Sequence, residues 1–159
     1  MNLLLSVDGQ FWRTPDGKVW SKTMYSYEFW KRYLNVFDYV DIVSRIKDIE
    51  YEKVPGYLRC DGERVTFKEF PMAIGAKEYL AQWRQIRKCA NKATQGNQCA
   101  IIRLPSISGF VVENEYRKTG KPYAVEVVVD PMTAYADNRL FQLLLTGLLK
   151  RSVMSANGV

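Results

Sequence analysis

Short apolar runs alternate with amphipathic stretches along this chain of 159 residues. Runs rich in β-branched residues predict strands over residues 2–7, 41–46, 64–70, 99–104 and 123–129. Apolar residues at helical spacing predict helices over residues 23–37, 76–93 and 106–118, and a last helix that Asp137 caps and that ends before Gly158. Strands that alternate with helices are typical of an α/β fold, with a mostly parallel sheet and right-handed crossovers.

The last predicted strand belongs to the most informative segment, YAVEVVVDP over residues 123–131. A strand that is apolar almost throughout is usually covered on both faces, as in a parallel sheet. Ligands of such sheets bind beyond the carboxyl ends of the strands. The two acids of this segment, Glu126 and Asp130, therefore mark the edge where we expect a site.

A polar and aromatic loop is expected over residues 8–22. Its turn signal is Pro15-Asp16-Gly17, and Phe11 and Trp12 before the turn could pair with Val19 and Trp20 after it. The sequence therefore predicts a small hairpin after the first strand.

Each predicted helix has an apolar face. These faces hold Tyr25, Phe29, Tyr33, Leu34 and Phe37 in the first helix, Tyr79, Leu80, Trp83, Ile86 and Ala90 in the second, and Leu140, Phe141, Leu144, Leu145, Leu148 and Leu149 in the last. The other side of the second helix carries a basic row of Lys77, Arg84, Lys88 and Lys92. That row is most simply a solvated face, and an anion-binding face is the alternative.

Composition narrows the classes of function. The net charge of +6 suggests an anionic partner, such as a phosphorylated ligand, a nucleic acid or an acidic membrane surface, or simply a soluble surface. The chain has no histidine, which excludes Ser-His-Asp and Cys-His nucleophiles and histidine metal sites within it. Three widely spaced cysteines without a CxxC pair argue against a disulfide framework or a zinc knuckle.

The familiar nucleotide and hydrolase motifs are missing as well. After the first strand the chain reads VDGQFW, which is not the GxGxxG of dinucleotide-binding enzymes. There is no P-loop and no Gly-x-Ser-x-Gly elbow. The sequence therefore supports neither a classical NAD enzyme, nor an ATPase, nor an α/β-hydrolase.

Polar residues at the predicted strand ends are the candidates for chemistry. Asp8 follows the first strand, Arg103 and Ser106 follow the fourth, and Glu126 and Asp130 belong to the fifth. Carboxylates can orient sugar hydroxyls, and a guanidinium suits a phosphate or carboxylate. Each residue also has a purely structural interpretation: Asp8 as a turn acid, Ser106 as a helix cap, and Arg103 as an internal partner of Glu126 or Asp130.

Two segments together resemble bacterial glycosyltransferases of capsular and exopolysaccharide synthesis. They are AIIRLPS at residues 100–106 and GKPYAVEVVVDP at residues 120–131, separated by a helix. The likeness extends over residues 1–159, which correspond to the N-terminal half of such an enzyme. It implies a GT-B fold of two Rossmann-like domains, of which this chain is a single N-terminal domain: a three-layer sandwich around a mostly parallel sheet.

The resemblance to this family, and to its family 4-like members, also implies roles. The N-terminal domain binds the acceptor, whereas the missing C-terminal domain binds the nucleotide-sugar donor, so we expect no cofactor or metal in this domain and no activity from it alone. No two glutamates lie eight residues apart here, which agrees with the absence of the Glu-x7-Glu motif of that second half. The implied acceptor-binding residues are Gly9, Gln10, Phe11, Trp12, Arg103, Ser106 and Glu126.

No catalytic residue is identified, because relatives often use a histidine that this chain lacks; Asp8 and Asp130 are the candidate acids. The expected partners are the chain's own C-terminal domain and a saccharide or lipid-linked acceptor, in the cytoplasm or at the inner face of the plasma membrane, without nucleic acid. The alternative is a non-catalytic α/β module that binds nucleic acid or sugar. Dispersed basic residues and the lack of RRM, KH or helix-turn-helix signatures argue against nucleic acid.

Overall fold

The fold was analysed in a computed structural model that describes residues 1–130 and 139–158. The strands are β1 (Asn2–Arg13), β2 (Val19–Ser21), β3 (Tyr39–Asp48), β4 (Leu58–Arg59), β5 (Val65–Phe70), β6 (Cys99–Leu104) and β7 (Tyr123–Val127). The helices are α1 (Tyr27–Leu34), a 3-10 turn η1 (Tyr51–Lys53), α2 (Gly75–Ala81), α3 (Trp83–Ala93), α4 (Ile107–Arg117) and α6 (Arg139–Ser155). The predicted α/β class is confirmed.

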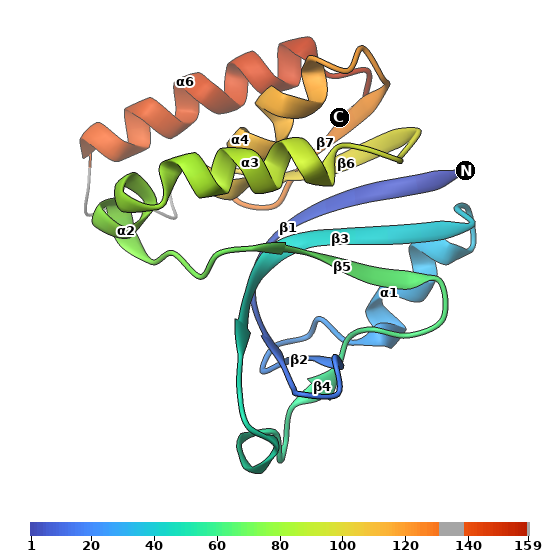
Figure 1. The fold of residues 1–159 in the computed structure, drawn as a ribbon. Helices are drawn as coiled ribbons and strands as arrows, with labels where there is room; N and C mark the ends of the chain where they lie inside the picture. Colours follow the sequence, from blue (N-terminus) through green and yellow to red (C-terminus); the bar gives the residue numbers. More distant parts are fainter. Residues whose placement is uncertain (131–138, 159) are drawn as a thin grey trace.

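All described strands belong to one mixed, seven-stranded sheet (Figure 1). Its centre is parallel: β3 and β6 pair with β1 on either side, β5 pairs with β3, and β7 pairs with β6. The order across this part is therefore β5-β3-β1-β6-β7. Two antiparallel pairings, β1 with β2 and β2 with β4, extend the sheet into a short arm.

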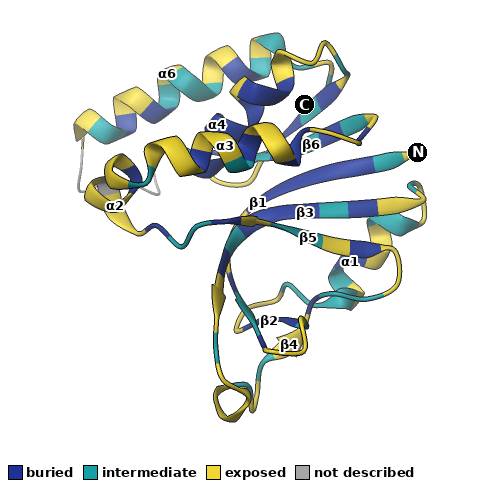
Figure 2. Ribbon diagram, viewed as in Figure 1, coloured by how far each residue is buried: buried dark blue, intermediate teal, exposed yellow. Residues whose placement is uncertain are grey.

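Helices cover both faces of the sheet and enclose two separate cores (Figure 2). On one face, Trp30 of α1 packs with Leu3 and Leu5 of β1. On the other face, Ile86 of α3 and Val112 of α4 pack against Leu4. The alternation of Leu3, Leu4 and Leu5, all fully buried, reflects the side-chain period of a strand that is covered on both sides.

Strand β1 is longer than predicted, because it continues through the segment expected to be a loop. Its register against β3 shifts between Ser6 and Gln10, which marks a bulge. The buried Ser44 hydroxyl accepts a hydrogen bond from Gly9 N at 3.2 Å and lies 3.0 Å from the carbonyl oxygen of Val7. The expectation that residues 8–13 form a loop is therefore wrong, since β3 supplies partners beyond the bulge.

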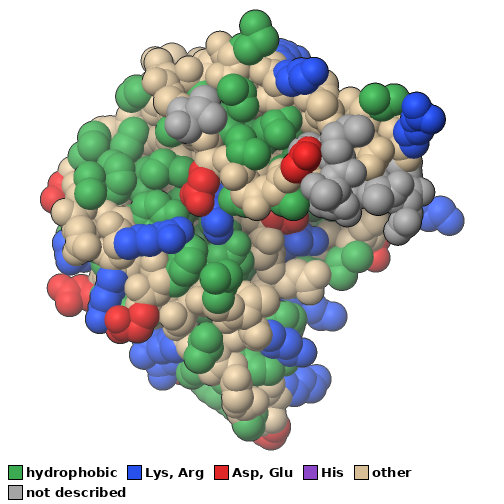
Figure 3. Space-filling view, turned by 180° about the vertical axis from the view of Figure 1, so that it is seen from behind, with side chains coloured by type: hydrophobic (Ala, Val, Ile, Leu, Met, Phe, Trp, Pro, Cys, Tyr) green, Lys and Arg blue, Asp and Glu red, His purple; other side chains and the backbone are tan. Residues whose placement is uncertain are grey.

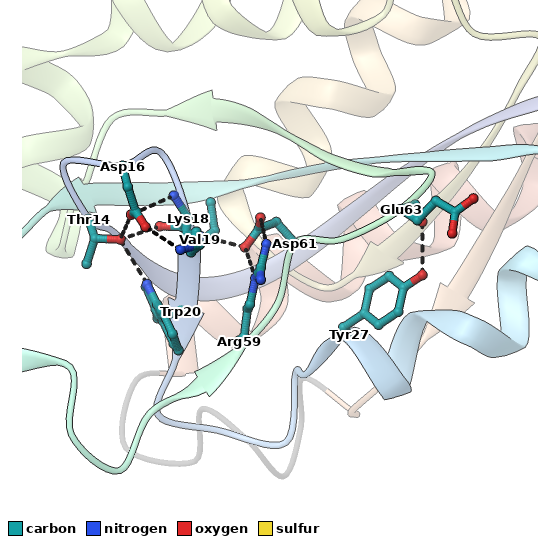
Figure 4. Close-up of polar contacts among 9 residues, drawn as sticks. All are labelled: Thr14, Asp16, Lys18, Val19, Trp20, Tyr27, Arg59, Asp61 and Glu63. Carbon is teal, nitrogen blue, oxygen red and sulfur yellow. Dashed lines mark hydrogen bonds and ion pairs between the residues drawn. The ribbon is translucent and has the colours of Figure 1, made fainter.

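The hairpin predicted after β1 is confirmed, with Trp12 opposite Trp20 and Arg13 opposite Val19. Figure 4 shows how its turn is held. The Thr14 hydroxyl donates to Asp16 at 2.6 Å and accepts from Trp20 Nε1 at 3.0 Å. In the arm, the Asp61 carboxylate accepts from the backbone N–H of Val19 at 2.8 Å and ties the chain beyond β4 to β2.

The predicted helices are present but differ in detail. The segment 76–93 is divided at Gln82 into α2 and α3, and its predicted buried residues Leu80 and Trp83 are exposed. The basic row of this segment lies in solvent, as in the simpler interpretation. In α6 only Leu145 of the predicted apolar face is fully covered, whereas Leu140 and Leu144 are exposed. The predicted cap Asp137 lies outside the described residues.

The end of the 123–129 run also departs from the prediction. Strand β7 stops at Val127, and Val127, Val128 and Val129 are each at least 40% exposed. β7 lies at the edge of the parallel part of the sheet and is paired along its length only with β6 among the described strands. The apolar run therefore predicts the strand correctly, but its last three valines are more exposed than the run suggests.

Candidate functional site

The strongest candidate site lies at the carboxyl ends of β6 and β7. Arg103 and Glu126 are direct partners in the register of these strands. Both side chains therefore point to the same face of the sheet, the face that α1 covers. Arg103 Nε lies 3.2 Å from Glu126 Oε2, with the Arg103 side chain 14% and the Glu126 side chain 39% exposed.

Aromatic side chains from α1 and the segment before it complete this group. Arg103 donates from a terminal nitrogen to the Tyr25 hydroxyl at 2.8 Å, and its guanidinium lies 5.7 Å from the ring of Tyr25 and 5.9 Å from that of Phe29. Tyr33 donates to Glu126 at 3.4 Å and accepts from Arg32 at 2.8 Å. We call these six residues the Arg103 cluster: Tyr25, Phe29, Arg32, Tyr33, Arg103 and Glu126.

The electrostatics of the Arg103 cluster favour an anion. Two guanidinium groups, of Arg32 and Arg103, stand beside one carboxylate, that of Glu126. Burial raises the pKa of Tyr33, the hydrogen bond from Arg32 opposes this shift, and the charge of Glu126 adds to it. The phenol is therefore held neutral as a donor, and a planar guanidinium is available for a phosphate or carboxylate.

Asp8 does not join this cluster. Its carboxylate pairs with Arg45 at 2.8 Å, and Arg45 also donates to the carbonyl of Ala73 at 3.2 Å. Ala73 belongs to the core under α3 and α4, so the Asp8–Arg45 pair lies on the face opposite Arg103. Asp130 is exposed in the segment after β7. Arg103 and Glu126 are thus brought together, whereas Asp8 is separated from them by the sheet.

The remaining candidates along β1 have mainly structural contacts. Phe11 is fully buried and packs on Phe67, with ring centroids 5.0 Å apart, so its ring is not available to a ligand. Gly9 is buried in the bulge, and Gln10 is exposed. Trp12 is partly exposed and packs edge-on against Tyr57, with Lys22 Nζ 5.0 Å from each ring.

Ser106 is the N-cap of α4. Its hydroxyl accepts a hydrogen bond from Gly109 N at 2.9 Å, and the residue is 4% exposed. This satisfies one of the unpaired amides at the start of the helix. The capping interpretation of Ser106 is therefore confirmed.

Helical spacing predicts Tyr25 and Tyr33 on the buried face of the first helix and gives Arg32 no role. The available signal was the spacing of Phe29 and Tyr33, one helical turn apart, with Arg32 between them. What the sequence did not contain was the register that places β6 and β7 under this helix. Among the described residues, no group of three potential metal ligands comes together, and no helix is long and apolar enough to cross a bilayer.

Comparison with known proteins gives one informative similarity. The chain is 31% identical over 111 residues to Protein CapJ of Staphylococcus aureus. The matched region is 70% of this chain but only 28% of CapJ. No family model matches the chain, and no solved structure matches it.

Proposed function

We propose that this chain is the acceptor-binding part of a glycosyltransferase that acts in capsular polysaccharide synthesis. The observation that carries the proposal is the Arg103 cluster, a partly exposed guanidinium held by Tyr25 and Glu126 at the carboxyl edge of a parallel sheet. The similarity to part of CapJ supports the capsule-related role. Transfer of a sugar, and the GT-B architecture with a second, donor-binding domain, belong to the proposal.

The strand order supports a Rossmann-like domain. Numbered along the chain, the five parallel strands β1, β3, β5, β6 and β7 have the order 3-2-1-4-5. In doubly wound folds of this order, ligands bind where the order reverses, between the first and fourth strands. Here those strands are β1 and β6, so the Arg103 cluster lies beside the expected crevice.

The proposed mechanism is positioning. Arg103 and Arg32 hold an anionic group of the acceptor, such as the phosphate of a lipid-linked saccharide, and Tyr33 donates to a saccharide hydroxyl. Asp130 is the candidate acid for orienting the attacking hydroxyl, because Asp8 is paired with Arg45 on the opposite face of the sheet. The nucleotide-sugar would be bound by another domain, and contact with the membrane face would come through the acceptor.

A transfer assay tests this function. Full-length protein is incubated with a panel of radiolabelled nucleotide-sugars and a lipid extract of the capsule-producing strain, and label in the extracted lipid is counted. Wild-type protein should transfer label, whereas Arg103→Ala should lose about tenfold or more in use of the extract, with donor binding unchanged. Arg103→Lys should be weak too, because lysine lacks the planar fork.

The matched control is Arg59→Ala, since Arg59 pairs with Asp61 on the arm and is half exposed. This variant should transfer label like wild type. Absence of transfer by folded wild-type protein with every donor, together with normal capsule after deletion of the gene, would overturn the proposed function. In the same assay Asp130→Asn should reduce transfer, whereas Asp8→Asn should transfer label like wild type, because Asp8 lies across the sheet from Arg103.

The alternative of a nucleic-acid-binding module finds less support in the surface. On the face seen in Figure 3, Lys and Arg side chains are spread among acidic and hydrophobic ones and do not form a block. An electrophoretic shift with arbitrary DNA or RNA that weakens steeply with salt would favour that alternative.

A further inference from the structure

A groove runs between α3, α4 and α6, on the face of the sheet opposite the Arg103 cluster. Its volume is about 410 Å³, within the range of small-molecule sites. We call it the helix groove. One end of its lining is apolar and the other end is basic, and this difference narrows the class of ligand that fits the groove.

One end of the helix groove is apolar. Trp83 of α3, Ile107 and Phe110 of α4, and Leu144 of α6 line it. Trp83 is 43% and Leu144 55% exposed, so the described chain leaves much of this apolar surface in water. All four residues lie in the first half of their helices, and α4 begins directly after the carboxyl end of β6.

The other end of the groove is basic. Arg117 is the last residue of α4, and Arg151 lies in the last third of α6. Arg117 follows Phe110 by seven residues, and Arg151 follows Leu144 by seven, so the two ends are about 10 Å apart. Within residues 1–130 and 139–158, neither arginine forms an ion pair. The third arginine of the lining, Arg87 of α3, is already paired with Glu115 at 3.5 Å.

The floor between the two ends is fixed by a buried polar group. Glu113 is 5% exposed, accepts a hydrogen bond from Tyr123 at 3.2 Å and accepts another from Ser152 of α6. These bonds tie α6 to α4 and β7, and so hold the groove open at a defined width. The Glu113 carboxylate is directed at these two hydroxyl donors. Arg117 and Arg151 together carry more positive charge than the one negative charge of Glu113, so this end keeps a net positive charge.

We propose that the helix groove binds a single-chain anionic amphiphile, such as an alkyl or prenyl phosphate. The aliphatic chain lies along Phe110 and Leu144, and the phosphate is held by Arg117 and Arg151. Burying the exposed apolar end is favoured by the hydrophobic effect, and guanidinium groups suit phosphate. This inference goes beyond the proposed function and does not depend on it, because the sheet separates the groove from Arg103.

A monomeric ligand fits the observations better than a bilayer surface. The groove is bounded by three helices and has the volume of one small ligand. Leu143, 60% exposed on α6, lies outside the lining, although a bilayer lying against this helix would contact it as readily as Leu144. Leu143 is therefore a matched control for Leu144, and Lys150, also outside the lining, is a matched control for Arg151.

Calorimetric titration of the full-length protein tests the proposal with dodecyl phosphate below its micelle concentration. Binding should weaken about tenfold in Leu144→Asn and in Arg151→Gln, and less than about twofold in Leu143→Asn and Lys150→Gln. Inorganic phosphate, which lacks the chain, and dodecyltrimethylammonium, which carries the opposite charge, should each bind about tenfold more weakly. Unfolding curves of the four variants confirm that each is folded.

Several outcomes would overturn the inference. Equal affinity for the cationic detergent, or equal loss in the variants and their controls, would show non-specific adsorption. Binding to phosphatidylglycerol vesicles that depends equally on Leu143 and Leu144 would indicate a bilayer. A dimer in sedimentation that Leu144→Asn dissociates would indicate a second copy of the chain. Each of these results leaves the glycosyl-transfer assay unaffected, so the two proposals fail separately.

Discussion

Arg103 and Glu126 stand opposite each other on adjacent parallel strands, with Arg103 Nε 3.2 Å from Glu126 Oε2. The pair is partly buried under α1, and each partner also contacts a tyrosine hydroxyl. Its geometry permits two roles. It links β6 to β7 across the sheet, and it holds a partly exposed guanidinium that, under the proposed function, exchanges its carboxylate partner for a phosphate of the ligand.

The contact between Glu126 and Tyr33 leads to the first prediction. Since the Glu126 charge helps to raise the pKa of Tyr33, Glu126→Gln should lower that pKa relative to wild type. Titration of the Tyr33 ring carbon in protein labelled with ¹³C-tyrosine measures the change. The control is Glu63→Gln, which removes an exposed carboxylate that contacts no tyrosine hydroxyl, since Tyr27 donates to the Glu63 backbone carbonyl. This variant should leave the Tyr33 pKa as in wild type. An unchanged Tyr33 pKa in Glu126→Gln would show that the Glu126 charge does not act on the Tyr33 hydroxyl.

The bulge in β1 gives the second prediction. A Cβ on Gly9 would lie 2.5 Å from the Phe11 ring, which is locked in the core. Gly9→Ala should therefore destabilise the protein by about 1–3 kcal/mol, as overpacking does. Gly147 in α6 has no atom within 4 Å of its Cβ position, so Gly147→Ala should stabilise by about 0.4–1 kcal/mol. Urea unfolding measures both, and a neutral Gly9→Ala would argue against the bulge.

The strands could be predicted from the sequence where their signals are local. The runs that became β5 and β6 are β-branched and end at Pro71 and Pro105, and their predicted bounds agree with the structure within one residue. The extension of β1 could not be predicted in the same way. Asp8-Gly9-Gln10 breaks the apolar pattern, and only the pairing with β3 and the Ser44 hydroxyl carries the strand past it.

The candidate site was predicted in part for a similar reason. The order of elements predicts Arg103 and Glu126 at strand ends, and an internal Arg103–Glu126 pair is one of the two interpretations that the sequence allows. The tyrosines of the Arg103 cluster were assigned to the core, because helical spacing shows which residues share a face but not what that face meets. The leucines of α6 show the same limit, since an apolar residue at helical spacing does not reveal whether another element covers it.

The third prediction concerns the dependence of stability on pH. Asp41 is partly desolvated, which by itself raises its pKa, but hydrogen bonds from Lys68, Thr66 and Asn97 outweigh this and hold its pKa below the usual value. Lys68 Nζ is 2.8 Å and Asn97 Nδ2 2.9 Å from the Asp41 carboxylate. A depressed folded-state pKa contributes stability that is present above the unfolded pKa, about 4, and is lost as pH falls through the folded value.

Asp41→Asn should therefore lower stability near neutral pH by about 1.5–3 kcal/mol and flatten the decline below about pH 4. Urea unfolding across the acidic range provides the measurement. Glu52→Gln in the exposed η1 removes one negative charge without touching this network and should retain the wild-type decline. A decline in Asp41→Asn as steep as in wild type would assign the acid sensitivity to other carboxyls.

The last prediction concerns the three thiols. Cys60 is fully buried beside α1, and its sulfur donates to the carbonyl of Tyr25 at 2.7 Å. Burial raises the pKa of Cys60 strongly, and the neighbouring Asp61 charge adds to the shift. Burial also raises the pKa of Cys89 and of Cys99, but both are partly exposed.

Because the thiolate is the reactive form, iodoacetamide at about pH 8 should label Cys60 last. Mass spectrometry of a labelling time course should show Cys60 reacting only as the protein unfolds in urea, whereas all three thiols should react alike in the unfolded chain. Native labelling of Cys60 as fast as Cys89 would mean that the segment between β4 and β5 opens without global unfolding.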